Sequence, residues 1–240
     1  MQKEVIIVGT SHIAKESAGK VKNVIEENQP DVVGIELDIT RYKALLSQNK
    51  PGAKKSSGFY TLRQIGLKGF LFAMIGSFTM KRLAKYIGTN PGVDMLEAAK
   101  IAKKNESRVY LIDRHINITL SKFSKALTTR EIFRFLWDIL KGIFNPRGEL
   151  KKIGIKRFDL NTIPGEEIVE KMILYMKKRY PSVYDVMVHQ RNVYMSKVII
   201  KIMESYDVEK MVAVVGAGHQ KGMKKILERE AKSNFHITTL

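Results

Sequence analysis

Short runs of valine and isoleucine, separated by stretches with helical spacing, constrain the fold of this chain more than any other feature. The runs show little alternation of apolar and polar residues, which is typical of strands covered on both faces. They cover Glu4–Val8, Val32–Leu37, Val109–Ile112, Met211–Val215 and His236–Thr239. Strand, helix and strand follow one another at both ends of the chain. This order predicts an α/β fold, with a mainly parallel or mixed central sheet flanked by helices and with largely helical insertions.

The helical stretches lie between these runs. In Ala14–Asn28 small and apolar residues recur at spacings of three and four, and Pro30 ends the predicted helix. Asp94–Asn105 and Met223–Ala231 have the same pattern. We expect a helical middle at about 118–206 and a basic, apolar insert at about 50–92.

Composition narrows the class of protein. With 240 residues, 44% hydrophobic and 28% charged, the chain is long enough to bury the core of one large domain. It has no cysteine, which excludes disulfides, thiolate metal sites and cysteine nucleophiles. The chain enters a strand pattern at once, and an apolar run of about 18 residues, the minimum for a membrane-spanning helix, is absent. We therefore expect a cytoplasmic protein, with peripheral membrane association left open.

The net charge of +18 is concentrated in two segments. From Ile39 to Val93 there are ten basic and no acidic residues, and from Arg114 to Gly165 there are eleven basic and four acidic ones. Charge gathered in this way is typical of a surface for phosphates or anionic lipid. The alternative is a solvated face that serves solubility.

Two apolar patches lie within these basic segments. Gly66–Met80 is almost continuously apolar, and Ile132–Phe144 places large side chains at helical spacing. Those side chains are Phe133, Leu136, Trp137, Leu140 and Phe144. Core packing, an interface between copies of the chain and binding to a membrane surface are all consistent with such helices. We do not expect a nucleic-acid partner, because no RNA- or DNA-binding module is recognisable.

Two of the strand runs lead into the same Gly-x-x-His turn. The first is Gly9-Thr-Ser-His12 and the second is Gly216-Ala-Gly-His219, so two of only five histidines occupy the same position after a strand. The carboxyl ends of strands are where open α/β sheets place their ligands. If the two strands are neighbours, the imidazoles of His12 and His219 face one cleft, where they could bind a divalent ion or carry protons.

Other polar residues stand at the ends of the predicted strands. Glu36 interrupts an apolar run, and a buried carboxylate is costly unless it meets a cation or metal, or is protonated with a raised pKa. Further candidates follow the second and third runs: Asp38, Arg41, Asp113, Arg114 and His115. Each of these could instead form an ordinary ion pair or cap a helix. Their joint occurrence at strand ends favours a site.

A further candidate lies in the long helical stretch near the C-terminus. Gln190, Arg191 and Asn192 precede apolar residues at core spacing. An arginine beside such a stripe indicates a buried guanidinium that binds a carboxylate, for which we expect Glu36 or Asp38.

Five motifs of this chain resemble those of the TraB/PrgY family, and they occur in the family's order over nearly the whole chain. They are Val8–His12, Pro30–Asp38 with Arg41, Leu111–Leu120, Gln190–Met195 and Val215–His219. The resemblance implies one TraB-like domain over residues 1–240. Related families include GumN and the Tiki proteins, described as proteases that need manganese or cobalt. The haem-binding ChaN proteins and the erythromycin esterases are more distant.

The resemblance implies a metal-dependent hydrolase, most simply a peptidase of the Tiki type. Its metal, Mn or Co with Zn as a further option, is expected on His12, His219 and Glu36. The catalytic set would be these three residues with Arg191, where Glu36 is a ligand or the general base. Substrate contacts are expected from Arg41, Asp38, Arg114 and Gln190.

One departure from the family pattern leaves an alternative open. Many members have Glu-Arg-Asp where this chain has Gln190, Arg191 and Asn192. A neutral Gln190 favours a protein that binds or sequesters a peptide or small ligand without turnover, at a membrane surface, as the pheromone shutdown associated with PrgY implies. The expected partners are therefore a peptide or small molecule, an anionic membrane surface and a second copy of the chain.

Overall fold

The computed structural model describes residues 3–10, 14–47, 92–144, 148, 166–205, 207–231 and 234–240. Within these residues, five strands form one all-parallel sheet in the order β3-β2-β4-β1-β5. The strands are β1 (Glu4–Thr10), β2 (Val32–Ile35), β3 (Arg108–Leu111), β4 (Lys210–Gly216) and β5 (His236–Thr239). The predicted α/β fold is confirmed, and the sheet is parallel rather than mixed.

The apolar runs form strands because both faces of the sheet are covered. Val5 and Ile7 of β1 face one core cluster, whereas Ile6 and Val8 face the other. The strand ends differ slightly from the prediction. β1 and β4 continue to Thr10 and Gly216, and β2 stops at Ile35, because the Leu37 N–H turns back to the Ile35 carbonyl at 2.7 Å.

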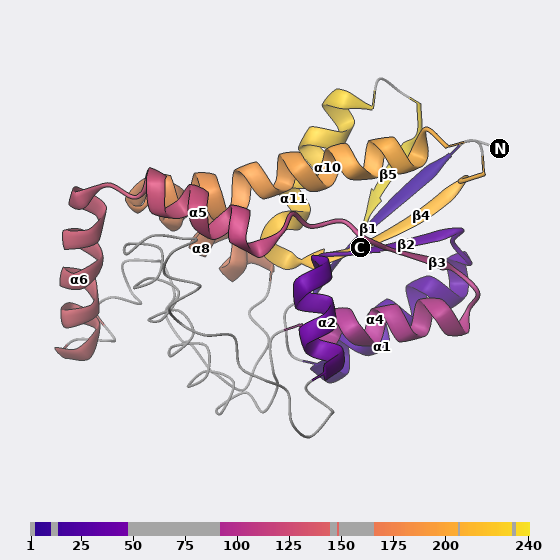
Figure 1. The fold of residues 1–240 in the computed structure, drawn as a ribbon, viewed down its shortest axis with the longest axis horizontal. Coiled ribbons are helices and arrows are strands. Elements are labelled where there is room, and N and C mark those ends of the chain that lie inside the picture. Colours follow the sequence, from indigo (N-terminus) through magenta and orange to yellow (C-terminus); the bar gives the residue numbers. More distant parts are fainter. Residues whose placement is uncertain are drawn as a thin grey trace.

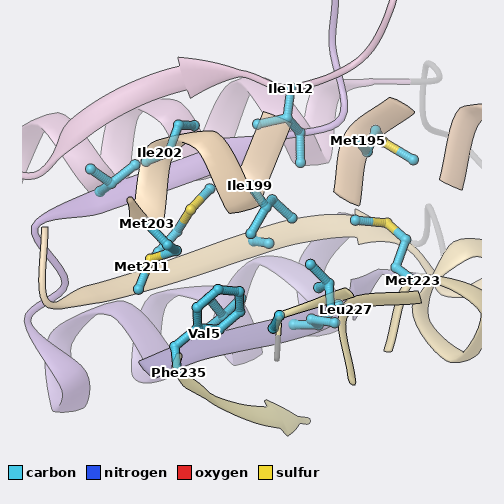
Figure 2. Close-up of a cluster of buried hydrophobic side chains, with 14 of the residues drawn as sticks. Val5, Ile112, Met195, Ile199, Ile202, Met203, Met211, Met223, Leu227 and Phe235 are labelled. Carbon is cyan, nitrogen blue, oxygen red and sulfur yellow. The ribbon is translucent and has the colours of Figure 1, made fainter. Parts of the chain in front are cut away.

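Helices cover the sheet on both sides (Figure 1). On one face α1 (Ala14–Asn28) and α4 (Val93–Lys104) contribute buried residues such as Ile25 and Met95. On the other face α10 (Gln190–Met203) and α11 (Ala217–Glu230) contribute Met195, Ile199 and Leu227, which Figure 2 shows packed over the strands. These two layers give the sheet its apolar core.

The predicted helices are present, but one begins earlier than expected. α1 has the predicted bounds, whereas α11 starts at Ala217 and not at Met223. The first six residues of α11 contain two glycines and a histidine, so this segment lacks the apolar spacing by which helices are recognised. Consequently His219 lies in the first turn of a helix, directly beyond the end of β4.

The remaining described elements are helical. They are α2 (Ile39–Ser47), α5 (Ile116–Ala126), α6 (Thr129–Phe144), α8 (Glu166–Arg179), α9 (Pro181–Tyr184) and a π-helical turn, η1 (Asp185–His189), that continues into α10. α5, α8 and α6 extend away from the sheet, and α6 stands at the far end (Figure 1). Most of the predicted insert, including Gly66–Met80, lies outside the described residues, so the division of the chain into scaffold and insert stays a prediction. Among the helices that the structure describes, none has the length and apolarity needed to span a bilayer.

Candidate functional site

The two Gly-x-x-His turns leave neighbouring strands. β1 and β4 pair in parallel, with Thr10 opposite Gly216, so both turns begin at the same edge of the sheet. This confirms the adjacency on which the shared cleft depends. His12 lies outside the described residues, and its position opposite His219 therefore stays a prediction.

Glu36 lies at this edge, directly after β2, and is 8% exposed. One of its carboxylate oxygens, Oε2, accepts a hydrogen bond of 2.7 Å from the Gly216 N–H. The other, Oε1, contacts the Arg191 guanidinium and lies 3.3 Å from His219 Nε2. Burial by itself raises the pKa of Glu36, but His219, Arg191 and the Gly216 N–H outweigh it and hold that pKa well below its usual value. Glu36 is therefore ionised at neutral pH.

Arg191 connects two buried carboxylates. Its Nη2 contacts Glu36 and also donates to Asp113 Oδ2 at 2.7 Å, and its Nε donates to Asp113 Oδ1 at 3.1 Å. This bidentate geometry is the one that guanidinium groups favour with carboxylates. Burial lowers the pKa of Arg191, but the two carboxylates outweigh it and raise that pKa above its ordinary value.

The expected partner Glu36 is confirmed, whereas Asp38 is not a partner of Arg191. Asp38 Oδ1 accepts the backbone N–H groups of Thr40 at 2.9 Å and Arg41 at 3.3 Å. It therefore caps the N-terminus of α2, as Asp often does. Asp38 Oδ2 is buried without a hydrogen-bond partner among the described residues.

Asp113 is a second carboxylate partner of Arg191, which the sequence did not predict. It follows β3, is 8% exposed and accepts from the Arg114 backbone N–H at 2.9 Å as well as from Arg191. Arg41 Nη1 lies 3.4 Å from Asp113 Oδ2, at the more open side of the pair. The carboxylates of two neighbouring strands thus share one arginine from α10.

His219 completes the cluster from the first turn of α11. Its Nε2 lies 3.1 Å from Arg191 Nη1, and its Nδ1 contacts Asn192 Oδ1. Asn192 Oδ1 can only accept, so this contact places a ring proton on Nδ1. Nε2 faces Arg191 Nη1 at 3.1 Å and Glu36 Oε1 at 3.3 Å, so it accepts from Arg191 in one protonation state of the ring and donates to Glu36 in the other.

Asn192 is a residue whose role the sequence analysis did not identify. It is 2% exposed, and α11 approaches it so closely that a Cβ on Gly222 would lie 2.2 Å from its Nδ2. The glycine is therefore needed for the contact between α10 and α11 that orients His219. The only sequence signal was the pattern Gly218-His219 with Gly222 along one helix.

Arg114 and Gln190 lie beside this cluster. Arg114 Nε donates to Thr119 Oγ1 at 2.8 Å, and its Nη1 donates to Gln190 Oε1 at 3.2 Å. Lys122 Nζ approaches the same amide oxygen at 3.4 Å, and Gln190 Nε2 donates to Asp185. Burial lowers the pKa of Arg114 and outweighs the opposing effect of Asp113. Two cationic groups thus converge on one neutral acceptor.

The π-helical turn η1 supplies acceptors for both arginines. Arg114 Nη2 donates to the Val186 carbonyl at 2.7 Å, and Arg191 Nη1 donates to the Met187 carbonyl at 3.2 Å. Such turns occur often at functional sites. His115, by contrast, has a structural role, because its Nδ1 accepts from the Asn117 N–H and caps α5.

A groove of about 490 Å³ lies between α5 and α10 next to Arg114 and Gln190. Its lining consists of Arg114, Ile118, Lys122, His189, Gln190, Val193, Tyr194 and Lys197. The described residues of the lining combine three cationic side chains with apolar ones and include no carboxylate. Its charge therefore favours an anionic ligand with an apolar part.

Two of the three predicted metal ligands lie together. Glu36 Oε1 and His219 Nε2 are 3.3 Å apart, and carboxylate oxygen with imidazole nitrogen is a donor pair that suits Mn, Co and Zn. Both atoms also contact Arg191. Among the described residues, no three potential ligands form a metal-binding group. The third predicted ligand, His12, lies outside the described residues.

The fold and the site define a class of protein: a parallel α/β domain whose strand ends carry a buried Glu-Arg-Asp-His cluster. The profile of the TraB/PrgY/gumN family matches residues 2–239, and the chain belongs to this family. The family resemblance predicted from the motifs is thereby confirmed.

Relatives of the chain were found in archaea and mammals. Uncharacterized protein MJ1365 of Methanocaldococcus jannaschii is 29% identical over 231 residues, which cover 96% of this chain and 55% of that protein. The TraB domain-containing protein of Homo sapiens is 26% identical, over 92% of this chain and 62% of its own length. That of Mus musculus is 25% identical with the same coverage. The chain thus spans less than two thirds of the length of these relatives.

Proposed function

We propose that this chain is a metal-dependent hydrolase that acts on peptides. The observation that supports this most is the position of Glu36 and His219 at one point of the sheet edge, at which β1 also ends, two residues before His12. Carboxylate oxygen and neutral imidazole nitrogen are the donor types that such a divalent ion takes as ligands.

In this proposal the metal is held by Glu36, His219 and His12, with Mn or Co favoured and Zn acceptable. A divalent ion at such a site lowers the pKa of bound water and polarises a carbonyl. Glu36 serves as a ligand and not as the general base, because its lowered pKa makes it a weak proton acceptor. Asn192 holds the Nδ1 proton of His219, and Arg191 fixes the carboxylates of Glu36 and Asp113.

The groove beside the cluster would hold the substrate. Arg114 and Lys122 both donate to Gln190 Oε1. A carboxylate of a bound peptide would accept hydrogen bonds from both of these cationic groups. Arg41, at the open side of Asp113, is available for a second contact. Asp38 is assigned a minor role here, because one of its oxygens already caps α2.

The test is peptide cleavage in the presence of Mn, Co or Zn, with the products identified by mass spectrometry. We expect cleavage by the wild type and loss of at least about 100-fold for Glu36→Gln and His219→Ala. Gly19→Ala is the matched control, because Gly19 lies on α1 and an added Cβ would meet no described atom within 4 Å. Equal activity of all variants would contradict the proposal.

A second candidate is binding of a peptide without turnover. It is favoured by the neutral Gln190 and by the contacts of Arg191 with both Glu36 and His219. Equilibrium dialysis with the same peptides, followed by mass analysis, distinguishes the two functions. Retention of intact peptide under all metal conditions would support the binder.

A further inference from the structure

The polar side of α6 faces the rest of the protein. Glu131, 4% exposed, accepts from the Ser182 N–H at 2.9 Å, and Arg134 Nη1 donates to the Arg179 carbonyl at 2.6 Å. Asp138 contacts the side chains of Arg179 and Tyr180. These interactions fix α6 against the C-terminal end of α8 and the start of α9, and they decide which side of α6 is turned outward.

The outward side carries the large apolar residues. Phe133 is 74% exposed, Leu136 is 46% exposed and Trp137 is 57% exposed. Residues spaced by three and four positions lie on one face of a helix, so these three form a single stripe. Ile132 and Phe135 of α6 pack inward, against the cluster around Phe123 and against the Tyr180 ring. The outward stripe, by contrast, is left exposed among the described residues, whereas the apolar face of a surface helix usually packs on the core. Figure 1 shows the helix at the end of the molecule, away from the sheet.

The charge around the stripe is positive and favours an anionic partner. Lys141 Nζ lies 5.2 Å from the centre of the Trp137 ring, and Arg130 is exposed at the start of the helix. The whole chain carries +18. A second copy would bring the same positive charge to the stripe, whereas anionic lipid headgroups complement it. Tryptophan flanked by lysine and arginine is typical of the membrane interface.

We propose that α6 lies in the interface of an anionic lipid bilayer, with Phe133, Leu136 and Trp137 inserted among the acyl chains. Arg130 and Lys141 then meet the headgroups. α6 binds parallel to the membrane surface and does not cross it. This inference does not depend on the proposed hydrolase activity.

Trp137 is the single tryptophan of the chain and reports directly on insertion. We expect its fluorescence to shift to the blue with vesicles of phosphatidylglycerol and phosphatidylcholine. Vesicles of phosphatidylcholine alone should give no shift, and added salt should weaken binding, because part of the attraction is electrostatic. The absence of a shift, or an equal shift with both vesicle types, would overturn the proposal.

Variants in α6 and in α2 distinguish membrane binding by α6 from non-specific binding by any exposed apolar residue. Leu136→Ser combined with Phe133→Ser should lower the affinity for vesicles, measured by co-sedimentation, by roughly tenfold or more. The reason is that each side chain contributes apolar area that is buried on membrane binding. Leu46→Ser is the control, because Leu46 of α2 has the same exposed fraction of 46%. Circular dichroism verifies the fold of each variant. An equal loss of vesicle binding in Leu46→Ser and in the double variant would contradict the proposal. So would a blue shift that appears without lipid, grows with protein concentration and comes with a doubled mass, because it would identify a second copy as the partner.

Discussion

Arg191 is the residue on which the buried charges depend. Its side chain is 11% exposed, and the two carboxylates that it contacts, Glu36 and Asp113, are 10% and 4% exposed. Removing one partner of a buried ion pair leaves the other charge desolvated and unpaired, which costs more than the pair itself contributes. The stability of this part of the protein therefore depends on the guanidinium.

Arg191→Met is expected to lower the free energy of unfolding by about 3–5 kcal/mol. Arg191→Lys should recover only part of this loss, because an ammonium group cannot form the bidentate contact with Asp113. Urea unfolding followed by circular dichroism measures both effects. Arg229→Met is the control, because Arg229 is 73% exposed and should change stability by less than about 0.5 kcal/mol. A loss below about 1 kcal/mol for Arg191→Met would refute this role.

At the residue scale, the sequence predicted which residues belong to the buried cluster better than it predicted which of them contact one another. A carboxylate in an apolar run and an arginine beside an apolar stripe identified Glu36 and Arg191. Of the two alternative partners, Glu36 is confirmed, and Asp38 is not used because it is followed immediately by α2 and its side chain caps that helix. Which carboxylate an arginine reaches depends on strand order and helix register, and neither is visible in one sequence.

Among the elements, α10 and α11 are joined by a close contact that orients His219. Gly222→Ala would place a Cβ 2.2 Å from Asn192 Nδ2, so Asn192 or the helix must move. We expect a loss of about 1–3 kcal/mol in unfolding free energy. Gly19→Ala, in open space on α1, should instead stabilise the protein by about 0.5–1 kcal/mol. Thermal unfolding of both variants tests this, and a stabilising Gly222→Ala would show that the contact is not tight.

The contacts of Asp138 in α6 with Arg179 and Tyr180 should contribute less stability in acid. Hydrogen bonds from Arg179 lower the pKa of Asp138, against the smaller opposing effect of burial, and the Tyr180 hydroxyl adds to the lowering. A lowered folded-state pKa contributes stability that is fully present above the unfolded value of about 4 and is lost as pH falls below it. Wild-type stability should therefore fall more steeply below about pH 4 than that of Asp138→Asn.

Unfolding in urea at a series of acidic pH values measures this difference. Glu27→Asn removes an exposed carboxylate of α1 and serves as the control. Parallel pH profiles for the wild type and Asp138→Asn would contradict the assigned charge state.

At the element scale, helices and strands with regular apolar spacing were predicted well. α1 matches its predicted bounds, and all five strand runs are strands. The early start of α11 and the π-helical turn η1 were not predicted. α11 packs closely against Asn192, and carbonyls of η1 accept from Arg114 and Arg191, and neither kind of contact leaves a periodic signal in the sequence.

For the whole molecule, the fold class followed from the sequence because buried parallel strands have a distinctive composition. The order of the strands did not, since the pairing of β1 with β4 joins segments from opposite ends of the chain. That pairing brings the two Gly-x-x-His turns to one edge. It is the basis of the central claim, that Glu36 and His219 belong to one metal site with His12.

Metal binding by the purified, chelator-treated protein tests that claim most directly. Titration with Mn or Co, followed calorimetrically, should show saturable binding by the wild type and by Gly19→Ala. Glu36→Gln and His219→Ala should bind the metal about 10–100-fold more weakly, while circular dichroism shows that they remain folded. No binding by the wild type, or equal affinity in all four proteins, would contradict the account.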